Sequence, residues 1–252
     1  MFTEDQLSDD NFLNGRLRLW QPLRGYRAAT DPVLLAAACP AAAGDSVLDL
    51  GCGAGAAALC LAVRVPGVKL AGLELQSGYA ELARRNAARN GIEMEVAEGD
   101  LRATPVALRR DFDHVICNPP YYPAGGTPSP VAMRAIAMQV EEVPLMDWIA
   151  CAGRRLRPGG WLTMITGTDA LPVLLGSLGK LGSGAVLPLA ARSGRPAKRV
   201  ILRARKGGKT PFRLLPPFVL HHGPSHDGDR EGYTLEASEI LRGGNDFSAQ
   251  FS

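Results

Sequence analysis

The sequence has few of the residues that build disulfide-rich or zinc-bound proteins. Its 252 residues include five cysteines, an odd number, widely spaced and without any Cys-x-x-Cys pair. Neither a disulfide framework nor a structural zinc site is expected, and we predict that no metal is bound. The acidic start Met1–Asp5 is followed by no apolar segment, so the sequence predicts no signal peptide.

Long hydrophobic runs are also missing. The most apolar stretch, residues 170–191, is interrupted by Pro172, Lys180 and Pro188, which excludes a membrane span there. With 46% hydrophobic and 21% charged residues, the composition is that of an ordinary globular protein. We therefore expect a cytoplasmic protein without membrane contact, built as one large domain or one domain with an appendage.

Strands and helices are predicted to alternate along most of the chain. After a helix that begins at Thr30, strands are expected at residues 47–50, 68–73, 92–96, 113–117 and 161–166, with helices at 56–64, 78–90 and 143–156 between them. This alternation is typical of βαβ units and a mostly parallel sheet. A helix at about 169–181 precedes two more strands, near 184–190 and 198–204. Because no helix separates these two, they predict an antiparallel hairpin at the sheet edge.

The chain is expected to have one folded domain flanked by two shorter parts. Residues 1–44 are interpreted as an N-terminal extension that packs on the core, with a short strand at Arg16–Trp20. Residues 45–210 form the doubly wound α/β domain, and residues 211–252 form a C-terminal tail. No internal repeat and no long linker divides the chain.

A glycine-rich turn follows the first strand of this domain, in the sequence Asp49-Leu-Gly51-Cys-Gly53-Ala-Gly55. Glycines let the backbone turn tightly and approach a ligand closely, and the following helix directs its positive end toward the site. The turn therefore predicts a nucleotide-type site. It also fits a dinucleotide fingerprint, with Glu74 placed to bind a ribose in either case.

Two further carboxylates favour S-adenosylmethionine over a dinucleotide. Asp49 would repel a pyrophosphate but attract an ammonium group, and Asp100 ends a strand at the carboxyl edge, where it could accept a hydrogen bond from an adenine amine. The predicted cofactor-binding residues are Asp49, Gly51, Gly53, Gly55, Glu74, Asp100 and Asn118.

Residues Val47–Gly55 resemble motif I of the class I S-adenosylmethionine-dependent methyltransferases, and the resemblance covers residues 45–205. It implies a Rossmann-like fold whose seven-stranded, mostly parallel sheet ends in an antiparallel hairpin. It also implies S-adenosylmethionine as the cofactor.

The sequence Asn118-Pro-Pro-Tyr121 ends the fourth strand of the domain. Two consecutive prolines fix the backbone and remove two N–H donors, so the segment is expected to be rigid. Oxygens of Asn118 and Pro119 that accept hydrogen bonds from an adenine amine would localise its lone pair toward a methyl donor, while Tyr121 offers a ring for stacking. We predict that Asn118, Pro119 and Tyr121 are catalytic.

This tetrapeptide resembles motif IV of the amino-methyltransferases, a group that includes adenine-N6, guanine-N2 and protein-glutamine-N5 enzymes. Residues Gln21–Leu35 resemble the stretch before motif I in the tRNA1(Val) adenine-N6 methyltransferase family, which modifies the adenosine next to the anticodon. The resemblance implies methylation of adenosine N6 in tRNA. A guanine-N2 rRNA enzyme, a protein-glutamine enzyme and a non-catalytic RNA-binding module are the alternatives.

Positive charge is concentrated late in the chain. Residues 181–226 contain nine lysines and arginines and no acid, which favours a polyanionic partner such as RNA. We predict RNA binding by Arg195, Lys198 and Arg199, with a second basic group at Arg16, Arg18, Arg24 and Arg27. Alternatively, these charges only solubilise an edge hairpin and its loop.

Overall fold

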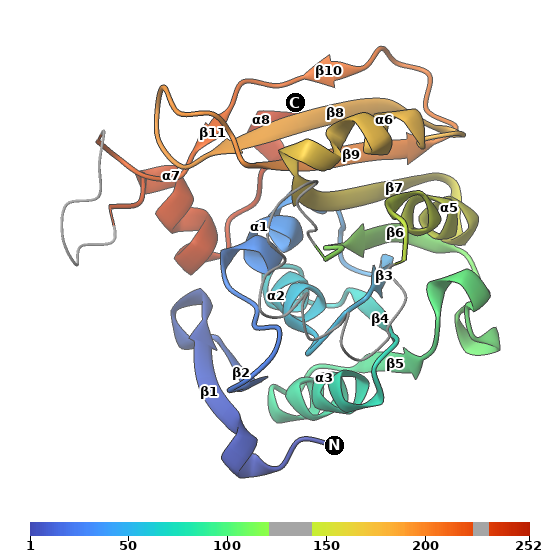
Figure 1. The fold of residues 1–252 in the computed structure, drawn as a ribbon, viewed down its shortest axis with the longest axis vertical. Coiled ribbons are helices and arrows are strands. Elements are labelled where there is room, and N and C mark those ends of the chain that lie inside the picture. The colour runs from blue at the N-terminus through green and yellow to red at the C-terminus, as the bar shows by residue number, and fades with distance from the viewer. Residues whose placement is uncertain (121–142, 224–231) are drawn as a thin grey trace.

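The computed structural model describes residues 1–120, 143–223 and 232–252, and within them the chain forms a large mixed sheet with helices on both faces (Figure 1). The strands of this sheet are β3 (Ser46–Leu50), β4 (Lys69–Glu74), β5 (Met94–Glu98), β6 (Phe112–Cys117), β7 (Leu156–Gly167), β8 (Leu181–Ala190), β9 (Arg199–Lys206), β10 (Arg213–Leu214) and β11 (Phe218–Val219). Their order is β10-β8-β9-β7-β6-β3-β4-β5, and β11 also pairs with β8.

The predicted fold class is confirmed. Strands β3 to β7 are parallel, while β9 runs antiparallel to both β7 and β8. The tail adds two short strands that were not predicted, because β10 and β11 pair in parallel with β8. The hairpin is therefore not the outermost part of this side of the sheet.

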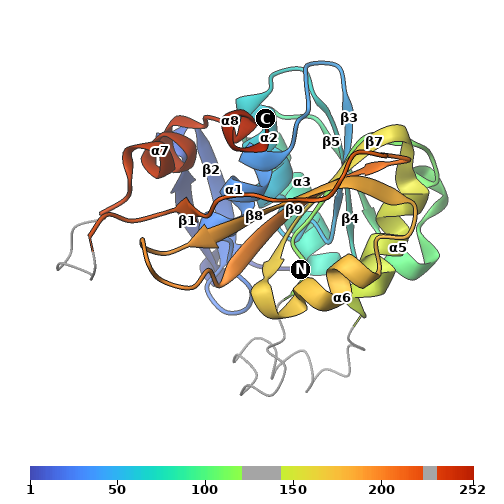
Figure 2. The ribbon, with the colours of Figure 1, turned by 90° about the horizontal axis from the view of Figure 1, so that it is seen from above.

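The helices cover the two faces of the sheet unequally. Helices α1 (Thr30–Ala38), α2 (Ala56–Arg64) and α3 (Ser77–Arg89) lie on one face, and α5 (Leu145–Arg155) and α6 (Leu171–Gly176) lie on the other (Figure 2). Each face has its own buried apolar cluster. The helix expected at about 169–181 is shorter than predicted: it ends at Gly176, and the chain then turns into β8 through Gly179, which adopts the left-handed conformation. Among the described helices, none is long and apolar enough to cross a membrane.

The N-terminal residues form a two-stranded hairpin of β1 (Leu7–Phe12) and β2 (Leu17–Pro22). The strand predicted at Arg16–Trp20 is thus present as β2, which buries Leu17 and Leu19 in the core. The fully buried amide of Asn86 on α3 joins the hairpin to the domain: it accepts from Trp20 N at 2.8 Å and donates to Trp20 O at 3.0 Å. Its partners satisfy an amide that would otherwise be costly to bury.

The described part of the tail packs beside α1. It contains α7 (Leu235–Ser238), a π-helical turn at Glu239–Gly243 and α8 (Ser248–Phe251). Phe247 is fully buried against Phe218, with ring centroids 4.8 Å apart, and its N–H donates to Ala37 O. The tail is thus anchored to α1, whereas the hairpin is joined to α3.

Candidate active site

The carboxyl ends of three neighbouring parallel strands carry the polar residues singled out in the sequence. Asp49 lies near the end of β3, Glu74 is the last residue of β4, and Asn118 directly follows β6. Because β3 pairs with both β4 and β6, these positions meet at one edge of the sheet. Asp49, Gly51 and Asn118 line a common cavity of about 40 Å³ together with Gln21 and Tyr26.

The glycine turn has the conformation that the sequence predicts. Gly51, Gly53 and Gly55 have φ values of 67°, 55° and 86°, in the left-handed region that favours glycine. The turn is held close to β4, because the N–H groups of Gly51 and Cys52 both donate to Leu73 O. A Cβ atom on Gly51 would lie 2.5 Å from the Trp148 ring, so the close approach of α5 also requires glycine at this position.

Asp49 is a buried carboxyl group, and among the described residues few hydrogen bonds offset the cost of burying it. It is 2% exposed, and Ala58 N donates to it at 3.3 Å. Burial, opposed by this hydrogen bond and reinforced by the nearby Glu74 carboxylate, raises the pKa of Asp49 to about 8. A cationic ammonium group in the cavity would stabilise the ionised carboxylate. The residues present therefore fit a ligand that carries an amino group.

Glu74 is oriented by the backbone on both sides of it. Its two oxygens accept from Gly53 N and Gln76 N, each at 2.9 Å. These bonds hold the carboxylate beside the glycine turn, although burial raises its pKa. Asp100 lies farther along the same edge, beyond β5, where it accepts from Arg102 N at 2.8 Å and pairs with the Arg102 side chain. The structure thus brings Asp49, Glu74 and the glycines together, while Asp100 caps the short helix Leu101–Ala103.

Asn118 and Pro119 stand at the end of β6, opposite the glycine turn. The amide nitrogen of Asn118 donates to the Tyr26 hydroxyl at 3.1 Å. Because the nitrogen end of the amide is directed to Tyr26, the oxygen end is presented on its other side. Pro119 is buried. Tyr121, the third predicted catalytic residue, lies outside the described residues.

Tyr26 is a site residue that the sequence analysis did not single out. Its ring lies against the glycine turn, where a Cβ atom on Gly53 would be 4.0 Å from it. Although 44% of the Tyr26 residue is exposed, desolvation of its hydroxyl, together with the Asp31 and Asp49 carboxylates, raises the pKa of Tyr26 to about 12, so the hydroxyl stays protonated. The available signal was its position in the stretch Gln21–Leu35, just before the domain.

The backbone of Tyr26 is itself held by Tyr79 on α3. The Tyr79 hydroxyl accepts from Tyr26 N at 2.9 Å and donates to Tyr26 O at 3.1 Å. Tyr79 on α3 thus holds the backbone of Tyr26, whose side-chain hydroxyl in turn holds the amide of Asn118.

The basic residues predicted to bind RNA lie at the same edge of the sheet as the cavity. The loop between β8 and β9 carries Arg195 and Lys198, both exposed, and β9 begins at Arg199 beside the carboxyl end of β7. Arg199 also has a structural partner, because its Nε donates to Asp31 at 2.6 Å. Arg195 and Lys198 are therefore better placed for a phosphate than Arg199.

Several other cations of the basic segment serve structural contacts elsewhere. Arg205 and Lys206, at the opposite edge of the sheet, donate to the carbonyls of Gly159 and Leu156. Arg203 lies over the rings of Trp161 and Phe251, and Arg213 donates to Phe251 O and Ser252 O. Fewer cations of this segment are therefore available to bind a polyanion than its net charge suggests.

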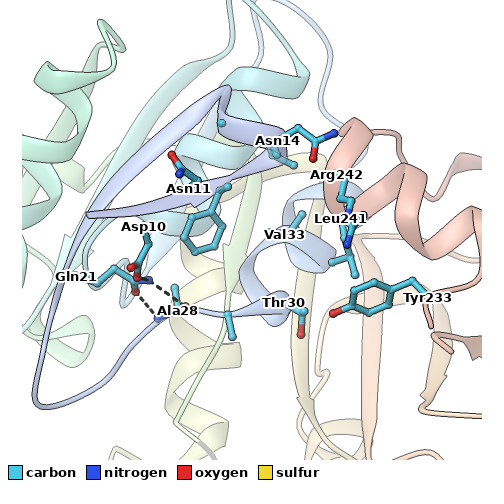
Figure 3. Close-up of a pocket in the computed structure, with 14 residues that line it drawn as sticks. Asp10, Asn11, Asn14, Gln21, Ala28, Thr30, Val33, Tyr233, Leu241 and Arg242 are labelled. Carbon is cyan, nitrogen blue, oxygen red and sulfur yellow. Dashed lines mark hydrogen bonds between the residues drawn. The ribbon is translucent and has the colours of Figure 1, made fainter. Parts of the chain in front are cut away.

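A second, larger cavity of about 730 Å³ lies between the N-terminal hairpin, α1 and the tail (Figure 3). Gln21 and Ala28 line this cavity and also the small one at the glycine turn. The Gln21 amide donates to Ala28 O at 3.1 Å and accepts from Ala28 N at 2.6 Å. These two residues therefore form a rigid wall shared by both cavities.

Comparisons with known proteins identify the family of this chain. The methyltransferase small domain model matches residues 29–172, more than half of the chain. A tRNA1(Val) (adenine(37)-N6)-methyltransferase of Aeromonas hydrophila is 33% identical over 72% of this chain and 77% of its own length. A release factor glutamine methyltransferase of Geobacter sulfurreducens is 32% identical, over 54% of this chain and 50% of its own length.

Solved structures show the same fold. A crystal structure described as a predicted O-methyltransferase from Agrobacterium tumefaciens is 25% identical, with a TM-score of 0.68 over 86% of this chain and 98% of that one. The Thermus thermophilus 16S rRNA N2 G1207 methyltransferase, solved with AdoMet and guanosine, aligns with a TM-score of 0.53 over 79% of this chain and 50% of its own, at 21% identity. The family model matches more than half of this chain, and the glycine turn and the Asn118 segment lie within the matched residues. This chain therefore belongs to the methyltransferase small domain family.

Proposed function

We propose that this protein transfers a methyl group from S-adenosylmethionine to the exocyclic N6 amine of an adenosine in tRNA. The observation that carries the proposal is the cavity in which Asp49 and the glycine turn face Asn118. A carboxylate suited to an ammonium group and an amide suited to an amine line one space. The cofactor supplies an electrophilic methyl group when it is bound.

Three residues would bind the cofactor through complementary groups. Asp49 would pair with the amino group of its methionine part, since none of the described residues that line the cavity is a cation that could pair with this carboxylate. Glu74, fixed by two backbone N–H groups, would accept from the ribose hydroxyls. Gly51 would contribute through its backbone, because its left-handed φ of 67° shapes the turn while its missing side chain makes room for Trp148 of α5.

Asn118 would act on the amine that receives the methyl group. Its amide oxygen and the Pro119 carbonyl oxygen would accept hydrogen bonds from the two N6 hydrogens. These bonds would keep the nitrogen lone pair directed toward the methyl group of the cofactor. The hydrogen bond to Tyr26 would hold the amide in this orientation. Alignment then supplies most of the rate, and no strong general base is needed because the methylated nitrogen loses its proton readily.

The relatives support tRNA adenosine as the substrate over the alternatives. The Aeromonas enzyme, named for adenine N6 in tRNA1(Val), is matched over 77% of its length, whereas the glutamine methyltransferase from Geobacter is matched over half of its length. The exposed Arg195 and Lys198, on the cavity's edge of the sheet, suit an RNA backbone better than a neutral glutamine loop.

A labelling experiment distinguishes these substrates. The purified protein would be incubated with methyl-labelled S-adenosylmethionine and, separately, with bulk tRNA, ribosomal RNA or release factor, with the Asn118→Ala protein as the matched control. We expect label in tRNA, recovered as N6-methyladenosine by mass spectrometry of the nucleosides. Label that entered only release factor, or only guanosine, would contradict the proposal.

A further inference from the structure

The larger cavity lies next to the small cavity at the glycine turn, but most of its lining comes from the N-terminal hairpin, α1 and the tail. The two share the wall of Gln21 and Ala28, so the larger space begins directly beside the small one. We infer that this space, here called the hairpin–tail groove, binds an unpaired nucleotide adjacent to the target adenosine. The inference rests on the proposed function, because it takes RNA to be the substrate.

The size and lining of the groove suit one nucleotide. Its volume of about 730 Å³ falls in the range of small-molecule sites, roughly 300–1,000 Å³. Asn11, Asn14 and Thr30 contribute side chains that both donate and accept hydrogen bonds, which suits the edges of a base. The rings and methyl groups of Phe12 and Val33 supply an apolar floor.

The tail closes the other side of the groove with groups that RNA-binding sites use. Figure 3 shows the Tyr233 side chain reaching from the tail toward Thr30, with Arg242 near Asn14. Tyr233 is already stacked on His221, with ring centroids 4.6 Å apart and planes 19° apart, so a base that stacks on its other face would extend an ordered pair. Arg242 is exposed at the rim, where a phosphate would pass.

The electrostatics of the groove also allow an anion. Asp10 is the one acid in the described lining, and its carboxylate is paired with Arg27 at 2.6 Å and accepts from Gln21 Nε2 at 2.6 Å. Its negative charge is therefore offset within the wall. Arg242 is the only other charged residue among the described lining residues.

The turn that lines the groove has a strained backbone. Leu13 and Asn14 adopt φ values of 51° and 55°, in the left-handed region that asparagine tolerates but a bulky leucine rarely adopts. Strain of this kind persists where the surrounding structure holds it, and here Arg16 links the turn to the tail through Gly243 O. The turn places the Asn14 amide among the residues that line the groove, whereas a glycine at this position would adopt the same conformation without strain but would supply no amide.

The test uses two groove variants and one matched control. Asn14→Gly removes the amide and relieves the backbone strain, so it should fold at least as well as the parent; Tyr233→Leu removes the ring. Asn245→Gly, an exposed asparagine of the same tail outside the groove lining, is the control. We expect both groove variants to raise the Michaelis constant for tRNA at least fivefold, while kcat and the affinity for S-adenosylmethionine change less than twofold.

An RNA change makes the test specific for one nucleotide. Short anticodon-loop RNAs would carry an abasic site directly 5′ or directly 3′ of the target adenosine. For the parent protein, one of the two abasic RNAs should lose about as much affinity as the Tyr233→Leu variant loses with intact RNA. Combined with that RNA, Tyr233→Leu should cause little further loss, because the two changes remove the same contact.

The outcomes separate the two proposals. If the parent protein methylates tRNA but the groove variants bind it as well as Asn245→Gly does, the groove inference is wrong and the proposed function stands. If the two losses multiply for both abasic RNAs, the ring does not contact a neighbouring base and the inference is also wrong. If the parent methylates no RNA, the proposed function fails first and the groove inference falls with it.

Discussion

The two cavities of this protein differ in how they are built. The small one, at the glycine turn, is formed by residues at the ends of adjacent strands, and its walls carry the buried Asp49 and the amide of Asn118. The larger one is formed where the N-terminal hairpin meets the tail, and its polar side chains are mostly neutral, with Gln21 the only buried one among the described lining residues. The comparison indicates that the buried ionisable group lies where the sheet fixes positions closely, whereas the flanking segments enclose a wider space.

The strongest test of this division removes the amide that faces the target amine. Asn118→Ala should lower kcat by about a hundredfold to a thousandfold, since a directed hydrogen-bond partner of the reacting group is lost. The dissociation constant of S-adenosylmethionine, measured by calorimetry, should stay within threefold. A variant that loses cofactor affinity as much as turnover would show that Asn118 serves binding and not the chemical step.

The next largest effect is expected at the cofactor side of the small cavity. Glu74→Ala should weaken S-adenosylmethionine binding tenfold or more, at about 1.4 kcal/mol per tenfold, because the carboxylate is held in place to accept hydrogen bonds. Isothermal titration gives the value directly. Unchanged affinity in Glu74→Ala would remove the residue from the cofactor site.

Asp49 predicts a dependence on pH with a definite sign. Its folded-state pKa of about 8 lies above the value of 3.8 for an ordinary aspartate, so the folded protein holds a proton that the unfolded chain has lost. Its contribution makes the free energy of unfolding decrease as pH rises from about 4 to about 8. Asp49→Asn should reduce this decrease, measured by urea unfolding at pH 5 and pH 8.

The same residue links cofactor binding to proton release. An ammonium group beside Asp49 lowers its pKa, so S-adenosylmethionine should bind with release of a proton near pH 7, seen as a dependence of the calorimetric heat on the buffer used. The Asp49→Asn protein should show less release. Equal release in both proteins would contradict the assignment of the amino group to this carboxyl.

A smaller effect is expected from the basic loop at the same edge of the sheet. Arg195→Glu with Lys198→Glu should raise the Michaelis constant for tRNA about tenfold and lessen its salt dependence by about two counterions, because two phosphate contacts are lost. Arg199 is left intact, since reversing it would place a carboxylate beside Asp31. Lys209→Gln, in the loop after β9, serves as the control, and an equal response from it would contradict a local RNA contact.

The smallest effect is expected at Tyr26. Tyr26→Phe keeps the ring against the glycine turn but removes the hydroxyl that accepts from Asn118, and one lost hydrogen bond is worth about 0.5–1.5 kcal/mol. We expect kcat to fall by about twofold to tenfold with little change in cofactor affinity. Tyr79→Phe, which removes the anchor of the Tyr26 backbone, should produce a similar change in kcat. No change in either variant would show that the amide is oriented by other contacts.

Much of the fold could be predicted because its strands are short apolar runs between clear breaks. The helix Ser77–Arg89 and the strand Phe112–Cys117 lie within a residue or two of their expected positions. The strand Leu7–Phe12 was missed because Ser8, Asp9, Asp10 and Asn11 follow no alternating pattern and it pairs only with β2. The two-residue strands of the tail were missed because such short pairings depend on β8 and not on their own residues.

The candidate site was predictable to the extent that its residues stand in motifs. Asp49, Glu74 and Asn118 follow strands whose ends meet at one edge, so their assembly follows from the topology. The partners of Arg199 and Asp100 could not be anticipated, because Asp31 is far from Arg199 in the sequence and an acid at a strand end binds a ligand or caps a helix equally well. Tyr26 was not predicted because no pattern in the neighbouring residues indicates that its hydroxyl will reach Asn118.

By itself, the sequence determined the order of strands and helices, the glycine turn and the rigid Asn-Pro-Pro segment, since these depend on local backbone preferences and on short-range apolar patterns. The tertiary structure alone decided which side chains met across long separations. It paired Tyr26 with Asn118, bound Arg199 to Asp31 and enclosed the hairpin–tail groove between segments at opposite ends of the chain. These contacts depend on how segments far apart in the sequence pack together, and local residue patterns do not predict such packing.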